Sequence, residues 1–153
     1  MEQTEKILIK RTDLKDLKKI IGFEKENSQF VQQYDLAEHK KILESECHLS
    51  IFKKENNSLI GHIILAGVNN KKKAIEFRRI VVTKKGFGYG KDSIELIKKI
   101  CFEKYKAQKI WLDVYSDNTK AIGLYKSQGF LKEKAIKNGN NPRDLWIMSA
   151  HNI

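Results

Sequence analysis

The chain has 153 residues, 41% of them apolar, so it is long enough to bury a core and its composition is that of a globular protein. The formal net charge of +11 fits an anionic ligand, but the lysines are scattered apart from the run 71–73, which makes nucleic acid an unlikely main partner. The charged N-terminus and the short longest apolar run, Ile63–Val68, exclude a signal peptide and a membrane span, so we expect a cytoplasmic protein.

The first elements are predicted to be one strand and two helices. Ile7–Lys10 has the apolar character of a strand. Thr12 or Asp13 then caps a helix with apolar residues at helical spacing, and Gly22 is expected to end it. A second, less regular helix is predicted over Phe30–Leu43.

Three strands separated by polar turns follow, at His48–Lys53, Leu59–Val68 and Ala74–Val82. They predict two antiparallel hairpins. Cys47 and Cys101 have no Cys-x-x-Cys spacing, so we interpret both as small core residues and expect no metal site.

The next segment predicts a β-α-β unit. Apolar residues after the glycines recur at i, i+3, i+7 and i+11, from Ile94 to Tyr105, which is the strongest helix pattern in the chain. Lys109–Tyr115 alternates as a strand does, and its pairing with Ala74–Val82 across that helix would be parallel.

The chain is predicted to end with one helix and two strands. Asp117 or Asn118 caps the helix, and Gly129 ends it. The strands are Phe130–Ala135 and Leu145–Ala150, with a loop at 137–142 between them. No repeat or linker interrupts the sequence, so we expect one domain over residues 1–153.

Three alternating glycines, Gly86, Gly88 and Gly90, lie between a predicted strand and the strongest predicted helix. Amides at a helix N-terminus are unpaired and carry partial positive charge, and glycine lets a phosphate approach them closely. The alternative is a tight turn that needs positive φ, but such a turn usually requires one glycine rather than three. We therefore favour phosphate binding.

Two familiar phosphate-binding motifs do not fit this turn. A Walker A loop in this register needs glycine at position 85 and a hydroxyl at 92, where the chain has Lys85 and Asp92. The dinucleotide motif needs a third small residue at position 91, where the chain has Lys91.

The stretch Lys85–Gly90 matches the pattern Arg/Gln-x-x-Gly-x-Gly/Ala with lysine in the first position. Farther on, Asp117–Phe130 contains an asparagine, an alanine three residues later, then Leu-Tyr and Gly-Phe. Together they resemble the acetyl-CoA core of the GNAT superfamily of N-acetyltransferases, and the earlier elements follow the same order. The resemblance implies an α/β (α+β) fold: a mixed, mostly antiparallel sheet of about seven strands flanked by about four helices, with a β-α-β acetyl-CoA-binding core.

The resemblance also implies roles for individual residues, with acetyl-CoA as the cosubstrate. Asn118 would hydrogen-bond the cofactor arm, and Tyr125 would protonate the departing thiolate. Backbone groups would hold the pantetheine arm and then the pyrophosphate, in chain order Ile80, Val81, Val82, Lys85, Gly86, Phe87, Gly88, Tyr89, Gly90 and Lys91.

Each assignment has a plain structural alternative. Asn118 is a common N-cap residue, and Tyr125 could be a core aromatic. Glu76 is the nearest candidate for the base that deprotonates the amine, although it could simply pair with Arg78. His62 and Asp113 are weaker candidates.

The predicted function is acetyl-CoA-dependent acetylation of a primary amine by direct attack on the thioester. The acceptor stays open among a protein N-terminus, a polyamine, and a small antibiotic or metabolite amine. A non-catalytic acyl-CoA-binding regulator is the alternative, because it needs the glycine turn but not Tyr125. A homodimer is a further arrangement to consider, while membranes are not expected as partners.

Overall fold

The computed structural model describes residues 1–83, 86–137 and 143–152. Within these residues eight strands form one sheet in the order β1-β2-β3-β4-β5-β6-β8-β7. All neighbours are antiparallel except β5 and β6, which are parallel. The strands are β1 (Glu2–Gln3), β2 (Ile7–Arg11), β3 (Cys47–Lys53), β4 (Ser58–Ala66), β5 (Ala74–Val82), β6 (Lys109–Tyr115), β7 (Leu131–Lys137) and β8 (Asp144–His151).

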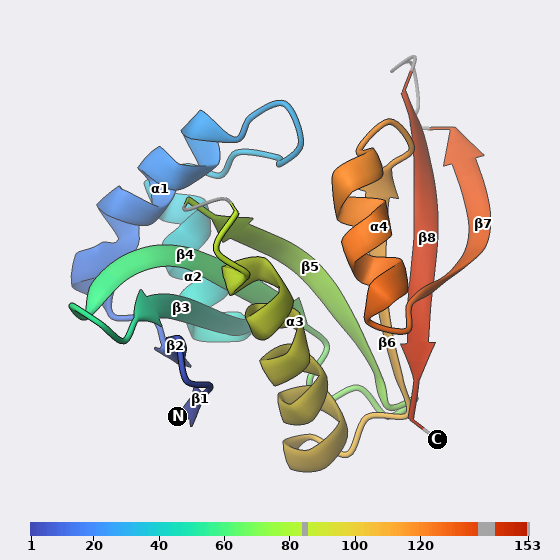
Figure 1. Cartoon of the computed structure of the whole chain (residues 1–153), viewed down its shortest axis with the longest axis horizontal. Helices are drawn as coiled ribbons and strands as arrows, with labels where there is room; N and C mark the ends of the chain where they lie inside the picture. The colour runs from blue at the N-terminus through green and yellow to red at the C-terminus, as the bar shows by residue number, and fades with distance from the viewer. Residues whose placement is uncertain (84–85, 138–142, 153) are drawn as a thin grey trace.

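Helices cover both faces of this sheet, as Figure 1 shows. They are α1 (Leu17–Glu26), α2 (Leu36–Ser45), α3 (Tyr89–Lys99) and α4 (Thr119–Ser127). A 3₁₀ turn, Leu14–Asp16, precedes α1, and a π-helical turn, Ile100–Lys104, extends α3. The larger apolar core lies between the sheet and the pair α3 and α4, and a smaller one lies under α1 and α2. None of the helices in the described part of the chain is long and apolar enough to cross a membrane.

The predicted fold class is confirmed, and so are most strands. Lys109–Tyr115 and Ala74–Val82 have the predicted bounds and the predicted parallel pairing. The sheet has one strand more than the seven expected, because Glu2–Gln3 pairs with β2. In the predicted 137–142 loop, Lys137 belongs to β7, and residues 138–142 lie outside the described residues.

Two predictions about the N-terminal helices are wrong. Gly22 does not end α1 but lies within it, because Leu17, Ile20 and Phe23 bury one face of the helix and that packing outweighs the helix penalty of about 1 kcal/mol for glycine. The second helix begins at Leu36 rather than Phe30. Its start is fixed by a capping box, in which the side chain of Asp35 accepts from the Glu38 amide and that of Glu38 accepts from the Asp35 amide.

A β-bulge in β5 determines which side chains reach each face of the sheet. Ile64 lies opposite Arg79, whereas Leu65 lies opposite Phe77, so Arg78 is the extra residue. Before the bulge, Phe77 faces the core under α3; after it, Arg79 faces α1 and Val82 returns to the α3 side. The bulge therefore places Arg79, one of three charged residues in β5, against α1.

Candidate active site

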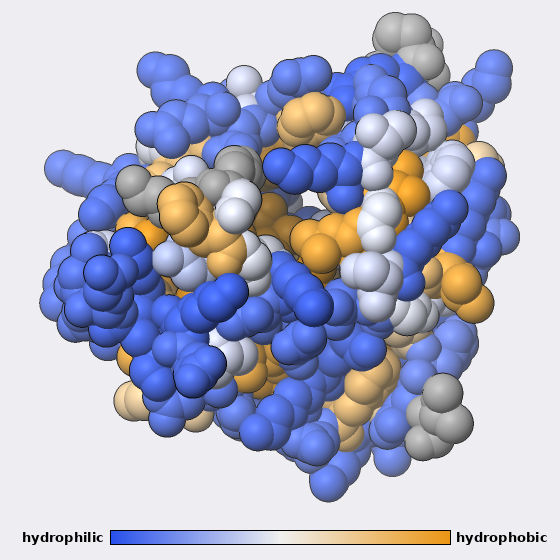
Figure 2. Space-filling model, in the orientation of Figure 1, coloured by the Kyte–Doolittle hydropathy of each residue, from blue (hydrophilic) through white to orange (hydrophobic). Residues whose placement is uncertain are grey.

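The strands β5 and β6 are paired over a short stretch only. Their register covers three pairs, from Ala74 opposite Lys109 to Glu76 opposite Trp111, after which the strands diverge (Figure 1). Figure 2 shows a hollow with hydrophobic surface between β5 and α4. The predicted pantetheine-binding segment, residues 80–82, lies in the part of β5 that has left β6, so its backbone is paired with β4 but not with β6.

The glycine turn leads into α3 with the geometry of an exposed helix N-terminus. Gly86 and Gly88 have φ of +83° and +80°, and Gly88 is the N-cap residue of α3, where no side chain caps the helix. A Cβ on Gly90 would lie 3.4 Å from Leu124 Cδ2, so this glycine permits the close approach of α4. Two glycines thus satisfy the turn and the third satisfies packing, while the first amides of α3 have no side-chain acceptor.

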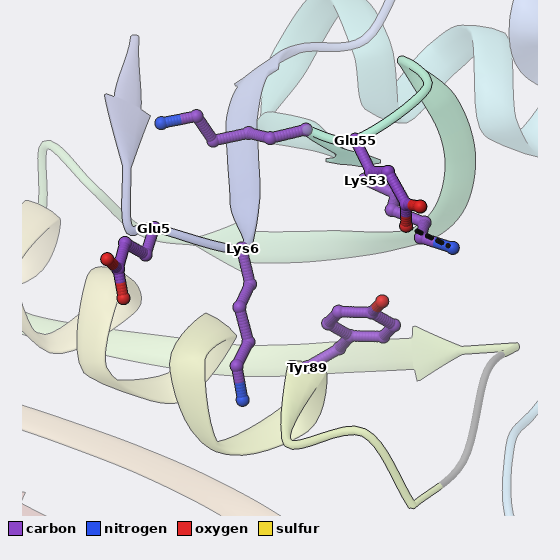
Figure 3. Close-up of a pocket in the computed structure, with 6 residues that line it drawn as sticks. Glu5, Lys6, Lys53, Glu55 and Tyr89 are labelled. Carbon is purple, nitrogen blue, oxygen red and sulfur yellow. Dashed lines mark ion pairs between the residues drawn. The ribbon is translucent and has the colours of Figure 1, made fainter.

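The side chains of this turn point away from the opening. Phe87 is 60% exposed and stacks on Tyr89, which is buried and faces a pocket between the start of α3 and the β2–β3 side of the sheet (Figure 3). Any contribution of Tyr89 to a ligand in the opening would therefore come from its backbone. Lys91 lies in the first turn of α3, and Lys85 lies outside the described residues.

Residues from the N-terminal segment contact the glycine turn and the start of α3. The sequence does not predict these contacts. Lys6 extends from the start of β2 to the beginning of α3, where its Nζ donates to the carbonyl of Phe87 at 3.1 Å (Figure 3). The hydroxyl of Thr4 donates to Asp92 in the first turn of α3 at 2.6 Å. The pocket that Lys6 and Tyr89 line has a volume of about 370 Å³ and contains none of the predicted catalytic residues.

Asn118 is the N-cap of α4, which confirms the structural alternative for this residue. Its side-chain oxygen accepts from the Ala121 amide at 3.3 Å, and its backbone amide donates to the Tyr115 carbonyl at 3.0 Å. The side-chain NH₂ group donates to none of the described residues. The cap therefore leaves a side-chain donor at the N-terminus of α4, close in the chain to the end of β6.

Tyr125 lies on α4 and packs edge-to-face on Phe77, with ring centroids 6.2 Å apart, and against Phe130 at 5.8 Å. The residue is 8% exposed, and its hydroxyl has no hydrogen-bond partner among the described residues. Burial raises the pKa of Tyr125, and the nearby charge of Asp113 raises it further. The phenol is therefore protonated at neutral pH, as a proton donor must be.

Two carboxylates lie on the other face of the sheet where β5 and β6 diverge. Glu76 accepts from Arg78 Nη2 at 3.0 Å and from Arg78 Nε at 3.3 Å, so the pairing that the sequence allowed is present. The backbone of Asp113, two residues beyond Trp111 on the same face of β6, is paired with β8, but its side chain has no hydrogen bond or ion pair with the described residues. Asp113 is exposed at the surface, but neighbouring groups partly desolvate its carboxyl, which raises the pKa, and the negative charge of Glu76 adds to that rise. Of the two, Asp113 is the carboxylate free to accept a proton.

His62 does not face the opening, because it belongs to a fully buried polar network centred on Glu24. Glu24 Oε2 accepts from His62 Nε2 at 2.9 Å and from Arg79 Nη1 at 3.0 Å. Its Oε1 accepts from His39 Nε2 at 2.9 Å and from the Tyr34 amide at 3.0 Å. Burial opposes ionisation of Glu24, but these hydrogen bonds outweigh it and hold its pKa far below the usual range.

The network continues as a chain of hydrogen bonds with one consistent direction. With neutral imidazoles, His39 Nε2 donates to Glu24, so His39 Nδ1 accepts from His48 Nε2 at 3.1 Å. His48 Nδ1 then accepts from the hydroxyl of Thr12 at 2.8 Å, and Thr12 accepts from Ser50 at 2.7 Å. Burial lowers the pKa of His48 to about 3, which is consistent with a neutral ring.

The sequence contains one signal for this network, the acidic residue on the apolar face of α1. Glu24 follows Phe23 and lies four residues after Ile20, on the buried face of α1. A charged residue on an apolar helix face is rarely buried without a partner. Within residues 1–83, 86–137 and 143–152 no group of three or more His, Cys, Asp or Glu could hold a metal ion. Two of the three histidines, His39 and His62, bond to Glu24, and His48 bonds to His39.

A family model of acetyltransferases matches residues 14–130, a stretch that contains the opening, the glycine turn, Asn118 and Tyr125. The chain belongs to the acetyltransferase (GNAT) family. A GNAT enzyme of this kind is an N-acetyltransferase, with acetyl-CoA as the acetyl donor. A search of curated proteins gave no significant match.

Solved structures with this GNAT fold resemble the chain over nearly its whole length. A chimera of the spermidine N-acetyltransferase SpeG from Vibrio cholerae with hSSAT has a TM-score of 0.82 and 21% identity, with 95% of each chain covered. The Vibrio cholerae spermidine N-acetyltransferase in complex with CoA and spermine has a TM-score of 0.82 and 20% identity, covering 97% of this chain and 96% of that one. A dodecameric structure of the Vibrio cholerae enzyme has a TM-score of 0.80 and 21% identity, covering 97% and 95%.

Proposed function

We propose that this GNAT protein acetylates a small cationic amine, which attacks the thioester of acetyl-CoA directly in the opening between β5 and β6. The observation that carries the proposal is the position of Tyr125 and Asp113. They approach the diverging strands from opposite faces of the sheet: Tyr125 is buried in the core, whereas Asp113 is exposed at the surface. The pKa of each is raised, by loss of solvent around the group first and, at Asp113, by the negative charge of Glu76 as well. An acid and a base are thus available on the two sides of one opening.

The fit of acetyl-CoA rests on the backbone. Residues 80–82 of β5 offer groups on the side where β6 has diverged, and these would bind the pantetheine arm. The amides of Gly86 to Lys91, at the uncapped start of α3, would bind the pyrophosphate. The NH₂ group of Asn118, at the N-terminus of α4, would donate a hydrogen bond to the pantetheine arm. Acetyl-CoA supplies the acetyl group in activated form, as a thioester.

The protons would move through two side chains. Asp113, or Glu76 after release from Arg78, takes a proton from the incoming ammonium group so that its nitrogen can attack. Tyr125 gives its proton to the sulfur of the departing thiolate, for which general-acid catalysis contributes roughly 10²- to 10⁴-fold in rate. Because Glu76 already forms an ion pair with Arg78, we favour Asp113 as the base, and Glu76 stays the alternative.

The preference for a cationic amine comes from the face that the acceptor would reach. Asp113 and Glu76 lie there together with the aromatic ring of Trp111, which is two residues before Asp113 on the same face of β6. Negative charge beside aromatic surface suits an alkylammonium group. The structural neighbours named above are spermidine acetyltransferases, so spermidine is the first acceptor to test. A peptide N-terminus and small metabolite or antibiotic amines are the other acceptors in the panel.

A free-thiol-release assay with acetyl-CoA and this panel tests the proposal. We expect turnover with at least one di- or polyamine and, for Tyr125→Phe, a kcat lower by about 10²-fold with unchanged affinity for CoA. Asp113→Asn should lower kcat/KM more than Glu76→Gln. A protein that binds CoA without turning over any amine would support the acyl-CoA-binding regulator instead. A homodimer stays a prediction, which light scattering would test.

A further inference from the structure

The opening between β5 and β6 is closed at its wide end by a contact far from the paired residues. The loop between α1 and α2, residues 27–35, reaches toward the unit formed by β6, α4, β7 and β8, here called the C-terminal arm (Figure 1). Arg143, just before β8, donates from Nη1 to the carbonyl of Gln29 in that loop at 2.7 Å. Among the described residues this is the only hydrogen bond between the α1–α2 loop and the arm.

Arg143 is itself held firmly on the arm. Its Nη2 and Nε donate to the two carboxylate oxygens of Asp117 at 2.6 and 3.1 Å, and its guanidinium lies 3.7 Å from the ring centroid of Tyr115 at the end of β6. On the loop side its guanidinium also lies 5.9 Å from the centroid of Phe30, an apolar residue that is otherwise exposed. A bidentate pair that stacks on aromatic rings fixes the orientation of the third guanidinium nitrogen.

The two attachments of the loop differ in strength. At its C-terminal end the Tyr34 amide donates to buried Glu24, and Arg79 lies 4.2 Å from the centroid of the Tyr34 ring. In this attachment Glu24 and Arg79 are buried and Tyr34 is partly exposed, and it belongs to the network described above. The Arg143 contact lies at the surface, with the side chains of Arg143 and Asp117 partly exposed. The loop is therefore anchored on β5 and held on the arm by a contact that solvent can replace.

From this geometry we propose that Arg143 is a positioning residue that clasps the α1–α2 loop to the arm and so closes the acceptor side of the opening. The acceptor amine reaches Asp113 when the clasp is released, and the loop covers it when the clasp forms again. This inference rests on the proposed function for the acceptor, but the clasp itself can be measured without any substrate. The family motifs do not predict the hydrogen bond between Arg143 and Gln29, since residue 143 lies beyond the matched region.

The test compares Arg143→Gln with Arg11→Gln by hydrogen exchange of the intact protein without ligand. Arg11 is a matched control, because it also donates to a backbone carbonyl from an exposed position, that of Leu43 at 2.9 Å, but far from the opening. We expect exchange of amides 28–33 to rise about fivefold or more in Arg143→Gln and to stay within twofold of wild type in Arg11→Gln. Asp117→Asn should cause part of the same increase, and the double variant Arg143→Gln/Asp117→Asn should not exceed Arg143→Gln alone.

Steady-state kinetics with spermidine and acetyl-CoA test the effect of the clasp on function. The clasp predicts a KM for spermidine raised severalfold in Arg143→Gln, with the affinity for CoA, measured by titration, within twofold of wild type. Unchanged exchange of the loop, or additive effects of Arg143→Gln and Asp117→Asn, would overturn the clasp. An exchange increase together with no acetylation of spermidine would leave the clasp standing and count against the proposed acceptor, so the two failures can be told apart.

Discussion

Replacement of Glu24 by glutamine removes one charge from the centre of the buried network without changing its shape. The carboxylate accepts four hydrogen bonds, two on each oxygen. Glutamine has one acceptor oxygen, and its NH₂ group would meet two donors. If the NH₂ group replaces Oε2, it faces Arg79, which cannot act as an acceptor; if it replaces Oε1, it faces the Tyr34 amide, which cannot accept either.

The expected cost follows from the burial of this pair. Arg79 is buried and would keep its charge without a partner, and removal of one member of a buried ion pair costs about 3–5 kcal/mol. For a chain of this length 1 kcal/mol corresponds to about 2–4 °C in Tm, so we expect Glu24→Gln to lower Tm by roughly 10 °C at pH 7. Glu26→Gln, an exposed position on the same helix, is the control and should stay within about 0.5 kcal/mol of wild type.

The pH dependence provides a second check on the same variant. Because hydrogen bonds hold the pKa of Glu24 below its ordinary value of 4.5, its contribution is complete above that pH and is lost only as the pH falls toward the folded-state pKa. The difference in unfolding free energy between wild type and Glu24→Gln, measured by urea titration, should therefore be constant from pH 7 to 5 and shrink in stronger acid. A Tm lowered by less than about 2 °C would refute the reasoning, since a charge partner of Arg79 cannot be removed at so small a cost.

Three other substitutions test separate parts of the structure. The pKa of His48 falls from 6.5 to about 3 on folding, so the unfolded chain binds the extra proton and stability should decrease as the pH drops from 6.5; His48→Gln should reduce that slope by about 1.4 kcal/mol per pH unit in urea titrations, and an unchanged slope would contradict a neutral buried ring. Gly88→Ala forces alanine to φ of +80° at the start of α3 and should cost about 1–2 kcal/mol in thermal unfolding and weaken CoA binding in a titration; wild-type affinity would show that the turn is not the binding element. Gly22→Ala meets open space within α1 and should stabilise the protein by about 0.5–1 kcal/mol, whereas a lower Tm would mean that the helix needs glycine there.

Local patterns predicted the strands and the glycine turn well because the cause of each is local. The alternation of Lys109–Tyr115 reflects one face in the core under α4 and one face outside it, and the turn before α3 needs residues that adopt positive φ. The start of α2 differs from the prediction because the capping box of Asp35 and Glu38 fixes it, whereas the apolar pattern that begins at Phe30 continues across the preceding loop.

The network and the clasp could not be predicted from local patterns. Glu24, His39, His62 and Arg79 come from four elements that are brought together only by the order of the strands and the bulge at Arg78. Similarly, Gln29 and Arg143 are separated by 114 positions. A single sequence contains no periodicity that relates such residues. The catalytic roles of Tyr125 and Asp113 stay predictions, since they depend on a ligand as well as on the fold.

The short pairing of β5 with β6 has a consequence for the folding of the chain. Near the opening the C-terminal arm is connected to the rest of the sheet by three residue pairs, by the packing of α3 and of Tyr125 on Phe77, and by the Arg143 contact. A molecule that fills the opening and contacts both strands adds a connection that the unfolded chain lacks, so its binding stabilises the arm and the remainder together. We therefore expect bound CoA to raise Tm and to make unfolding more cooperative. The hydrogen-exchange rates of the β6 and β8 amides should then approach those of the β4 amides.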